Sequence, residues 1–418
     1  MELYYLWNDR MSDIDYEQEE DPEEYFYKLI YEEKDKWSWI TDDYASLEAS
    51  YDGEPVEMGY SPSFYLMSDN ESVYIVVDYV YEGSPADEAG IERGDIILSI
   101  DNTELNTSNY YDLYSQDAYS VQLAEINNNI ISYTGESINL VARVVETNPV
   151  LYHDVIDLEG HKVGYLVYAE FITGKDDKFL TTLDEVFSEF QTEGISDLVV
   201  DLRYNPGGDI DAAVYLASAI APTETASGED VLISLQYNDN LQSYFEYNLN
   251  EYEDNLYYYF RSDVVNINMK RVYFLTSSGT ASSSELVMSG LMPYMDVTLI
   301  GEDTYGKCYG AWVMPDDNEE WAIIPIVMKY ANADGYTDFI TGIPVDDEVE
   351  PDYLSSTPFG DLSDAALAKA LSLATGVELT TESSLKSASL NLTKLTTPKL
   401  EKKRNLIISE HSGLMDAN

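Results

Sequence analysis

The sequence predicts an α/β protein whose core alternates strands with helices, preceded by an N-terminal helical segment and a small β domain. Three patterns predict this fold class. Aromatic residues recur at roughly helical spacing in residues 1–58, short β-branched strands separated by turn residues fill residues 59–147, and strand–helix repeats fill residues 148–376. Such repeats place helices over a sheet. Residues 377–418 differ in composition and are expected to form a C-terminal tail.

Charge and the scarcity of cysteine and histidine argue against several classes of protein. The chain has 79 acidic and 22 basic residues, a formal net charge of −57. Such a surface repels phosphate backbones and anionic lipid headgroups, so no nucleic acid is expected as a partner. A single cysteine, Cys308, excludes an internal disulfide framework, and three histidines argue against a multi-histidine metal centre. No apolar run reaches about 18 residues, so we expect no transmembrane segment in this chain.

The N-terminal segment, residues 1–58, mixes aromatic residues with acids. The aromatic spacing predicts two or three short helices that pack through one aromatic face. The chain starts with Met1 and is amphipathic from its first residues, so we expect that a leader has been removed upstream.

The β domain, residues 59–147, is predicted from a strand at Val73–Val80 and from the turn residues that follow it. The stretch from 82 to 91 predicts a turn and a short helix that ends at a glycine, and the stretch from 94 to 101 predicts a tight turn and a buried strand. A closing strand is expected at Ser137–Val145. This pattern resembles a PDZ domain, although an unrelated small β domain remains an alternative.

The core, residues 148–376, alternates strand and helix patterns. Apolar residues recur on one helix face from Leu180 to Phe190, and further helices are expected at Ile210–Ile220 and Ser283–Met292. Residues 222–262 are acidic and rich in tyrosine, and we interpret them as an insertion or a lid-like excursion. The predicted strands are Val163–Tyr168, Asp197–Leu202, Val272–Leu275 and Val297–Ile300.

The tail has the opposite charge balance from the rest of the chain. Residues 377–418 hold six basic and five acidic residues, a net charge of +1, whereas the first 376 residues hold 16 basic and 74 acidic residues, a net charge of −58. We expect an appendage that is either flexible or docked against the body through Asn405–Ile408.

Two strand-to-helix junctions carry residues suited to chemistry. In the first, Asp201 to Gly208 (DLRYNPGG), consecutive glycines let backbone N–H groups approach a ligand, which suits an oxyanion. An ordinary turn would use the same residues. In the second, Thr280 to Glu285 (TASSSE), a serine at the junction exposes its hydroxyl, but Ser282 with Glu285 also fits a capping box.

Lys307 is a candidate for the base that a serine nucleophile needs. A histidine base is possible through folding but has few candidates, with His161 before Ser282 and His411 after it. Lys307 follows Gly306, which permits a sharp turn, and its neighbours are Gly and Cys rather than acids. A lysine can replace histidine where burial lowers its pKa and keeps the amine neutral. The alternative is a surface cation.

Together these motifs resemble those of the carboxyl-terminal processing, or tail-specific, serine proteases. The family signatures are a DLR-NPGG loop, a Ser-Ala-Ser-Ala-Ser-Glu string and a (F/Y)GK turn, matched here by 201–208, 280–285 and 305–307. The resemblance covers roughly residues 1–376. It implies a PDZ domain joined to a core of the crotonase-like type and a Ser282–Lys307 dyad, with no metal or organic cofactor.

The resemblance also implies how a substrate binds. Polypeptide partners would enter through a free C-terminus, held by a PDZ loop near Ser63, Phe64, Tyr65 and Leu66, and N–H groups of Gly207, Gly208 and Ser283 would form the oxyanion hole. It favours the bacterial cell envelope, periplasmic or lipid-anchored, as the location.

The chain departs from the family at the group that would orient the lysine. Ala311 and Pro293 replace the usual glutamine and aspartate, so this group is unassigned, with Asp296, Glu302 and Asp303 nearby in sequence. Ser283 is a rival nucleophile, whereas Cys308 is expected to be buried and inert, because no histidine is placed to activate it.

Two other functions are open on the sequence. A weak or inactive PDZ-containing peptide-binding protein would explain Ala311 and Pro293. A crotonase-type acyl-thioester enzyme would use the glycine loop but leaves the PDZ-like segment and the spacing of Lys307 unexplained.

Overall fold

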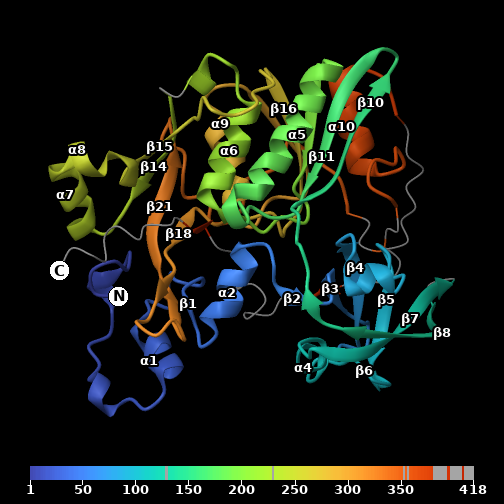
Figure 1. Cartoon of the computed structure of the whole chain (residues 1–418), viewed down its shortest axis with the longest axis horizontal. Coiled ribbons are helices and arrows are strands. Elements are labelled where there is room, and N and C mark those ends of the chain that lie inside the picture. The colour runs from blue at the N-terminus through green and yellow to red at the C-terminus, as the bar shows by residue number, and fades with distance from the viewer. Residues whose placement is uncertain are drawn as a thin grey trace.

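The computed structural model in Figure 1 describes residues 1–127, 130–227, 230–351, 354, 357–379, 393–395 and 407–408. The upper part of the view holds a mixed sheet with its helices, and the lower part holds the N-terminal segment on one side and a separate β-rich body on the other.

The main sheet contains the strands predicted for the core. Its order is β10-β11-β12-β16-β17-β22, with β10 antiparallel to β11 and every other neighbouring pair parallel. The strands are β10 (Val150–Leu158), β11 (His161–Tyr168), β12 (Asp197–Asp201), β16 (Arg271–Thr276), β17 (Asp296–Gly301) and β22 (Asp347–Glu348).

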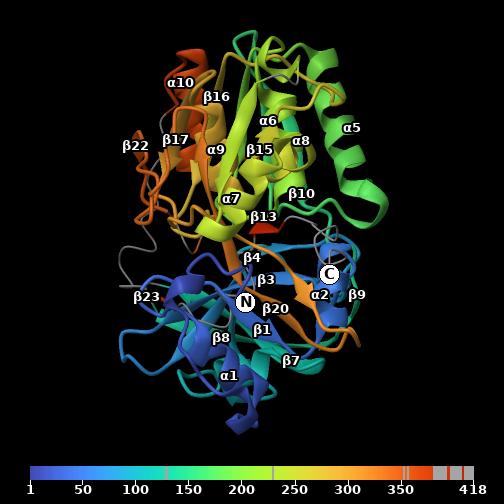
Figure 2. The ribbon, with the colours of Figure 1, turned by 90° about the vertical axis from the view of Figure 1, so that its left-hand side faces the viewer.

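Helices cover both faces of this sheet, which is why its central strands are apolar along their whole length. Along β12, Leu198 and Val200 belong to one hydrophobic cluster and Val199 to another, because successive side chains point to opposite faces. The first cluster includes α5, α6 and α9, and the second includes α10; Figure 2 shows α10 and α5 on opposite sides. These helices are α5 (Lys178–Glu193), preceded by η3 (Lys175–Asp177), α6 (Ile210–Ile220), α9 (Ser283–Leu291) and α10 (Ala365–Thr375).

A second six-stranded sheet, in the order β13-β24-β18-β21-β14-β15, overturns the lid-like interpretation of residues 222–262. β14 in that segment pairs antiparallel with β21, so the segment is part of a sheet. The strands are β13 (Gly208–Asp209), β24 (Ile407–Ile408), β18 (Tyr309–Ala311), β21 (Ile326–Asn332), β14 (Val231–Gln236) and β15 (Tyr257–Tyr259), with η4 (Thr225–Ser227), α7 (Asp239–Tyr247), α8 (Leu249–Tyr252) and η5 (Glu253–Asn255).

The N-terminal segment combines short helices with strands, so the expected helical segment is not confirmed. Its strand β1 pairs antiparallel with β20, and β2 pairs with β9 of the β-rich body. Its aromatic residues do pack inward, and Trp37 lies 5.1 Å from the ring of Tyr309. The elements of the segment are η1 (Asn8–Arg10), η2 (Tyr16–Gln18), α1 (Pro22–Leu29), β1 (Trp39–Thr41), α2 (Tyr44–Tyr51) and β2 (Val56–Glu57). β1 shares a three-stranded sheet with β19 (Met314–Pro315) and β20 (Ala322–Ile324), which come much later in the chain.

The β-rich body has its own hydrophobic core and a sheet in the order β23-β3-β4-β5-β7-β8. Ser63 to Leu66, expected in a loop, lie within strand β3. The elements are β3 (Tyr60–Leu66), β4 (Val73–Val80), α3 (Pro85–Glu88), β5 (Ile96–Ile100), β6 (Thr103–Glu104), α4 (Tyr110–Tyr114), β7 (Ala118–Asn127), β8 (Ile130–Val141), β9 (Arg143–Val144) and β23 (Thr393–Lys394).

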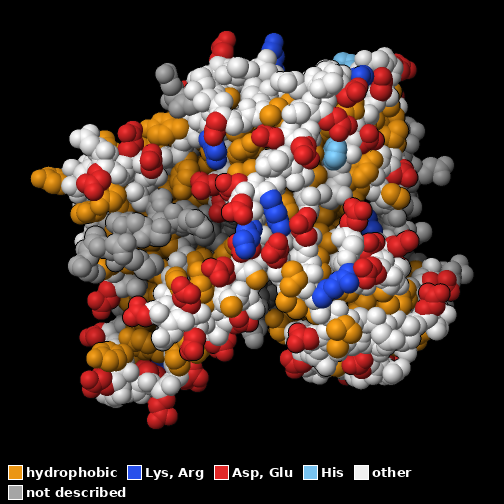
Figure 3. Space-filling model, viewed as in Figure 1, with side chains coloured by type: hydrophobic (Ala, Val, Ile, Leu, Met, Phe, Trp, Pro, Cys, Tyr) orange, Lys and Arg blue, Asp and Glu red, His pale blue; other side chains and the backbone are white. Residues whose placement is uncertain are grey.

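Acidic side chains are distributed over the whole face shown in Figure 3, as the net charge of −57 requires. Within the described residues, none of the helices combines the length and the apolar composition that a membrane crossing needs.

A buried ion-pair network fixes the loop that follows β12. Arg203 in this loop contacts Asp201 at 2.6 Å and Asp364 at 2.8 Å. Asp364 is the N-cap of α10, where it accepts backbone N–H groups of the first turn. The guanidinium therefore joins the loop to the helix on the far face of the sheet.

We predict that Arg203→Met lowers the free energy of unfolding by about 3–5 kcal/mol, because it leaves the fully buried carboxylate of Asp201 and the part-buried carboxylate of Asp364 without their cation. Arg261→Met is the control. Arg261 pairs with the exposed Asp263, so its loss is expected to change stability by about 1 kcal/mol or less. Urea denaturation of both variants measures the difference, and equal midpoints contradict the prediction.

Candidate functional site

Ser282 lies at the first turn of α9 in a backbone conformation that side chains rarely adopt. Its φ is 61° and its ψ is −116°, and its side chain is fully buried. A non-glycine residue in this region costs about 1–3 kcal/mol and persists only where its surroundings hold it. Among the described residues the Ser282 hydroxyl has no hydrogen-bond partner. The hydroxyl half of the expected capping box is therefore not formed, and the oxygen is left free for other chemistry.

The glycine loop packs directly against this serine. A Cβ at Gly207 would lie 2.6 Å from the Cβ of Ser282, so only glycine fits there. The N–H of Gly207 donates to the side chain of Asn205 at 2.9 Å. The expectation that Gly207 is an oxyanion donor stays a prediction, and in this structure its hydrogen is used within the loop. Gly207 also provides the space in which the loop approaches the serine.

Glu285, one turn further along α9, joins the serine junction to the lysine turn. Its carboxylate accepts the backbone N–H groups of Ser282 and Lys307, both at 2.8 Å, and that of Gly306 at 2.7 Å. The Thr304 hydroxyl donates to the same carboxylate at 2.5 Å. Burial raises the pKa of Glu285, and these hydrogen bonds act in the opposite direction. The sequence analysis interpreted Glu285 only as a cap, because its second set of donors is 19 to 22 residues away.

Lys307 is fully buried, and its amine has no hydrogen-bond partner among the described residues. Burial lowers the pKa of Lys307 from 10.5 to about 7, although the nearby carboxylates of Glu285 and Asp35 act to raise it. Asp35 belongs to the N-terminal segment and is itself buried. A lysine in this environment is neutral in a large fraction of molecules near pH 7 and can accept a proton.

Tyr330 on β21 holds the same two residues from the other side. Its hydroxyl lies 3.1 Å from the carbonyl oxygen of Ser282 and 3.1 Å from that of Lys307. Sequence analysis missed Tyr330, because nothing local distinguishes it from the other tyrosines of a chain that has 37 of them.

The other candidates take structural roles. The Ser283 hydroxyl donates to the carbonyl oxygen of Gly208 at 2.7 Å, so this rival hydroxyl is engaged. Cys308 is buried, and burial raises the pKa of its thiol. Ala311 lies in β18 and Pro293 follows α9, and neither provides a polar group.

The three acids considered as lysine-orienting groups lie elsewhere. Asp296 is exposed at the start of β17, Glu302 contacts Ser278, and Asp303 accepts the N–H of Val345 at 3.0 Å. The carboxylate that does contact the lysine turn is that of Glu285.

The expected peptide-binding residues follow one strand of the β-rich body. The Ser63 hydroxyl donates to Asp78 at 2.7 Å, and Phe64 and Tyr65 are buried. On one side β3 pairs with β4, and on the other it pairs with β23 of the C-terminal segment.

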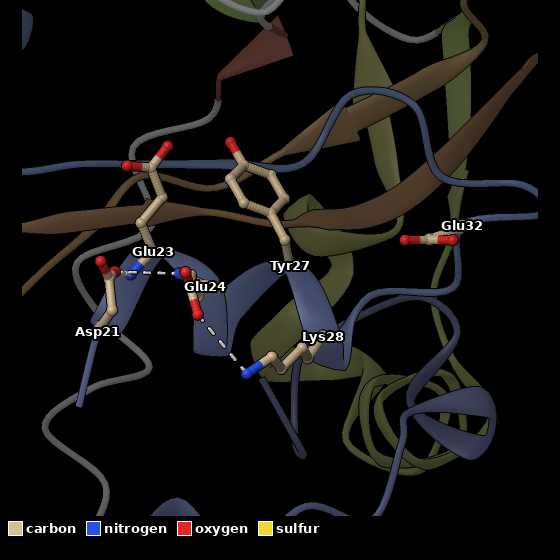
Figure 4. A pocket seen from close by; sticks show the side chains of 6 residues that line it. All are labelled: Asp21, Glu23, Glu24, Tyr27, Lys28 and Glu32. Atoms are coloured by element: carbon tan, nitrogen blue, oxygen red, sulfur yellow. Dashed lines mark hydrogen bonds and ion pairs between the residues drawn. The ribbon is translucent and has the colours of Figure 1, made fainter. Parts of the chain in front are cut away.

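A surface pocket on α1 lies apart from these motifs in sequence and contains none of their residues. Figure 4 shows its lining, which is mainly acidic, with Lys28 paired to Glu24 at 3.8 Å. In the described part of the chain, no group of three or more His, Cys, Asp or Glu side chains is placed to hold a metal ion.

The buried amine makes a prediction about stability. Between about pH 7 and 10.5 the unfolded chain binds a proton at Lys307 that the folded chain lacks, so this residue's contribution to stability rises with pH. We predict that Lys307→Met is more stable than the wild type at neutral pH, by on the order of 4 kcal/mol, and that the gap closes towards about pH 10.

Thermal midpoints measured across this pH range test the difference between the two proteins. Lys369→Met, at a half-exposed lysine paired with Asp347, is the matched control and is expected to show no such trend. A gap for Lys307→Met that is constant with pH contradicts a lowered pKa.

Comparison with known proteins assigns this arrangement to a family. Residues 162–354 match the model described as Peptidase family S41, residues 1–39 match the Peptidase S41 N-terminal domain, and residues 76–121 match the PDZ domain. The two S41 models together cover more than half of the chain.

Curated relatives carry matching names. A carboxyl-terminal-processing protease of Synechocystis sp. is 25% identical over 303 residues, which are 70% of this chain and 63% of the relative. The carboxy-terminal processing protease CtpB of Bacillus subtilis is 23% identical over 269 residues, which are 63% of this chain and 48% of the relative. The chain thus spans about half to three-fifths of the length of the curated relatives that it matches.

Solved structures share the fold. A Bacteroides fragilis protein named as a candidate S41 protease superposes with a TM-score of 0.73 and 28% identity, covering 90% of this chain and 96% of that chain. The photosystem II D1 C-terminal processing protease superposes with a TM-score of 0.50 and 19% identity, covering 85% and 92%. The family and the PDZ domain predicted from the sequence are therefore confirmed, and the chain belongs to peptidase family S41, with homologues named carboxyl-terminal processing proteases.

Proposed function

We propose that this chain is a serine endopeptidase in which Ser282 is the nucleophile and Lys307 the general base. One observation carries the proposal: a buried hydroxyl and a buried amine, both without hydrogen bonds among the described residues, stand on two backbone segments that one carboxylate, that of Glu285, binds together. An unsatisfied buried polar group is costly and calls for an explanation, and a catalytic role is one such explanation.

The reaction proceeds in two steps. The Ser282 oxygen attacks the substrate carbonyl carbon while its proton passes to the neutral Lys307 amine, and the carbonyl oxygen becomes negative. When the C–N bond breaks, Lys307 returns the proton to the leaving amine. Lys307 then removes a proton from water, which attacks the acyl ester on Ser282, and Lys307 returns that proton to the Ser282 oxygen as the second product leaves. The chemistry requires no metal or organic cofactor.

Backbone N–H groups of Gly208 and Ser283 are the proposed oxyanion donors, each contributing roughly 3 kcal/mol to transition-state stabilisation. Both residues border Ser282: Ser283 follows it at the start of α9, where a helix favours negative charge, and the Ser283 hydroxyl binds the carbonyl oxygen of Gly208. The hydroxyl and amine are not hydrogen-bonded to each other, and such contacts commonly tighten only when substrate binds.

The proposed substrates are polypeptides that present a free C-terminus. Within the β-rich body, β3 is the last strand of the sheet, and the strand beyond it, β23, comes from the C-terminal segment. An extended peptide can add to this edge of β3 as a further strand. The family resemblance further supports a core of the crotonase-like type, a location in the bacterial cell envelope, and domain boundaries at 1–58, 59–147, 148–376 and 377–418.

A peptide-binding protein without catalysis is the second candidate. The missing hydrogen bond between Ser282 and Lys307, together with apolar Ala311 and Pro293 at the positions of the usual orienting groups, favours it. Covalent labelling by a fluorophosphonate separates the two functions, because only an activated serine reacts.

We predict that Ser282→Ala abolishes fluorophosphonate labelling and lowers casein turnover by at least about 1,000-fold. Ser289→Ala is the matched control, since this serine is also buried on α9 and its hydroxyl donates to the carbonyl oxygen of Leu286 at 3.3 Å. Wild-type cleavage by Ser282→Ala rules out the mechanism.

Glu285→Gln is expected to lower kcat, because an amide places a donor against three backbone N–H groups. It also removes a negative charge that raises the pKa of Lys307. The acidic limb of the kcat/KM profile, near pH 7 in the wild type, is therefore expected to move to lower pH.

Glu302→Gln is the control for this charge effect, because Glu302 contacts Ser278 rather than the lysine turn. A role of Glu285 in packing alone predicts lower activity with an unchanged acidic limb. That result shows that the carboxylate does not act on Lys307.

A further inference from the structure

We propose that the chain's own C-terminal segment, through β23 and β24, is an intramolecular ligand that competes with incoming polypeptides for the peptide-binding edge of the PDZ domain and for the glycine loop. One consequence of this inference, that the tail lowers turnover, rests on the proposed function. The pairing of the tail itself stands on the structure alone.

The first contact is a strand added to β3. Thr393 is in register with Leu66 and Lys394 with Tyr65, antiparallel, and the N–H of Leu395 donates to the carbonyl oxygen of Phe64 at 2.8 Å. The side chain of Leu395 packs against the hydrophobic core of the PDZ domain. This is the geometry of β-strand addition, in which main-chain hydrogen bonds and one apolar anchor bind a peptide. The edge proposed for substrates is thus occupied by the chain itself.

The second contact lies at the glycine loop. Ile407 is in parallel register with Gly208 of β13, and Ile408 is in parallel register with Asp209 and with Ala311 of β18. β13 contains the last glycine of the loop, and β18 starts two residues after Lys307. A strand of the tail therefore lies between the two segments that flank the candidate catalytic residues, where the backbone of another chain cannot pair at the same time.

Charge favours this docking. Residues 386–404 contain six basic residues and one acidic residue, whereas the first 376 residues carry a net charge of −58. Opposite charges of this size attract the tail to the body before any specific contact forms. The same physics indicates the class of competitor: an extended, basic polypeptide segment with aliphatic residues where it reaches the loop.

A reversible disulfide tests the proposal in the full chain. Leu66→Cys with Thr393→Cys places two cysteines at directly opposed antiparallel positions, whose Cα separation of about 4.5–5.5 Å suits a disulfide. Cys308 is fully buried and does not compete for pairing. Oxidation holds the tail on β3, and reduction releases it. Because the oxidised and reduced samples are the same folded protein, a difference in binding between them is not caused by misfolding of a variant.

Binding is measured first, in a Ser282→Ala background, with a fluorescent synthetic peptide that has the sequence of residues 393–408. We expect the oxidised protein to bind this peptide at least about 10-fold more weakly than the reduced protein, a difference of about 1.4 kcal/mol. The Leu395→Pro substitution removes the N–H donated to Phe64 and weakens the docking of the tail. A protein with this substitution is therefore expected to bind the fluorescent peptide more tightly than a protein with the unsubstituted tail. The single variants Leu66→Cys and Thr393→Cys, treated with the same oxidant, control for oxidation.

Turnover of casein is measured next, with Ser282 intact, and is expected to fall on oxidation and to return on reduction. Peptide affinity that does not change with oxidation overturns the proposal, whatever the turnover. Rapid removal of the tail by the wild type, seen in its intact mass, also overturns it, because the tail is then a substrate. A redox-dependent affinity without any turnover supports the competing tail and instead contradicts the proposed endopeptidase function.

Discussion

The buried carboxylate of Glu285 is the constraint on which the site depends. It accepts backbone N–H groups from two segments, the start of α9 and the turn after β17. These segments cannot separate without leaving the buried anion unsatisfied. A buried ion without partners costs several kcal/mol, and four donors offset that cost only while both segments stay in place. The positions of Ser282 and Lys307 follow from this interaction, because both residues donate their own N–H groups to it.

The amine of Lys307 has a lowered pKa although the protein as a whole is strongly negative. A protein with a net charge of −57 favours positively charged groups near its surface. Burial of Lys307 reverses this effect, because loss of water opposes the charged form more strongly than Glu285 and Asp35 support it. Asp35 comes from the N-terminal segment, so this segment takes part in setting the basicity of the candidate site.

Local sequence patterns predicted the bounds of several helices and strands, but they did not predict which strands pair with each other. Val73–Val80 and Ile210–Ile220 have the predicted bounds, since the apolar period of a strand or helix is written in consecutive residues. The pairing of β14 with β21 joins residues about a hundred positions apart, and nothing in residues 222–262 identifies that partner. The motifs predicted Ser282 and Lys307 as candidates, but the connection through Glu285 depends on a turn that becomes adjacent only in the folded chain.

The tail contacts show why backbone pairing alone cannot make this protein selective. An exposed strand edge offers the same N–H and C=O groups to every extended chain, including the chain's own C-terminal segment. A tethered segment acts at an effective concentration on the order of millimolar, so a free polypeptide that uses only one of the two edges competes poorly with it. A polypeptide that binds β3 and the glycine loop at once gains the same advantage, because its second contact is also intramolecular. On the proposed competition, long extended chains that reach both edges displace the tail more readily than short peptides that fill one, and the distance between β3 and β13 sets the length that such a chain needs.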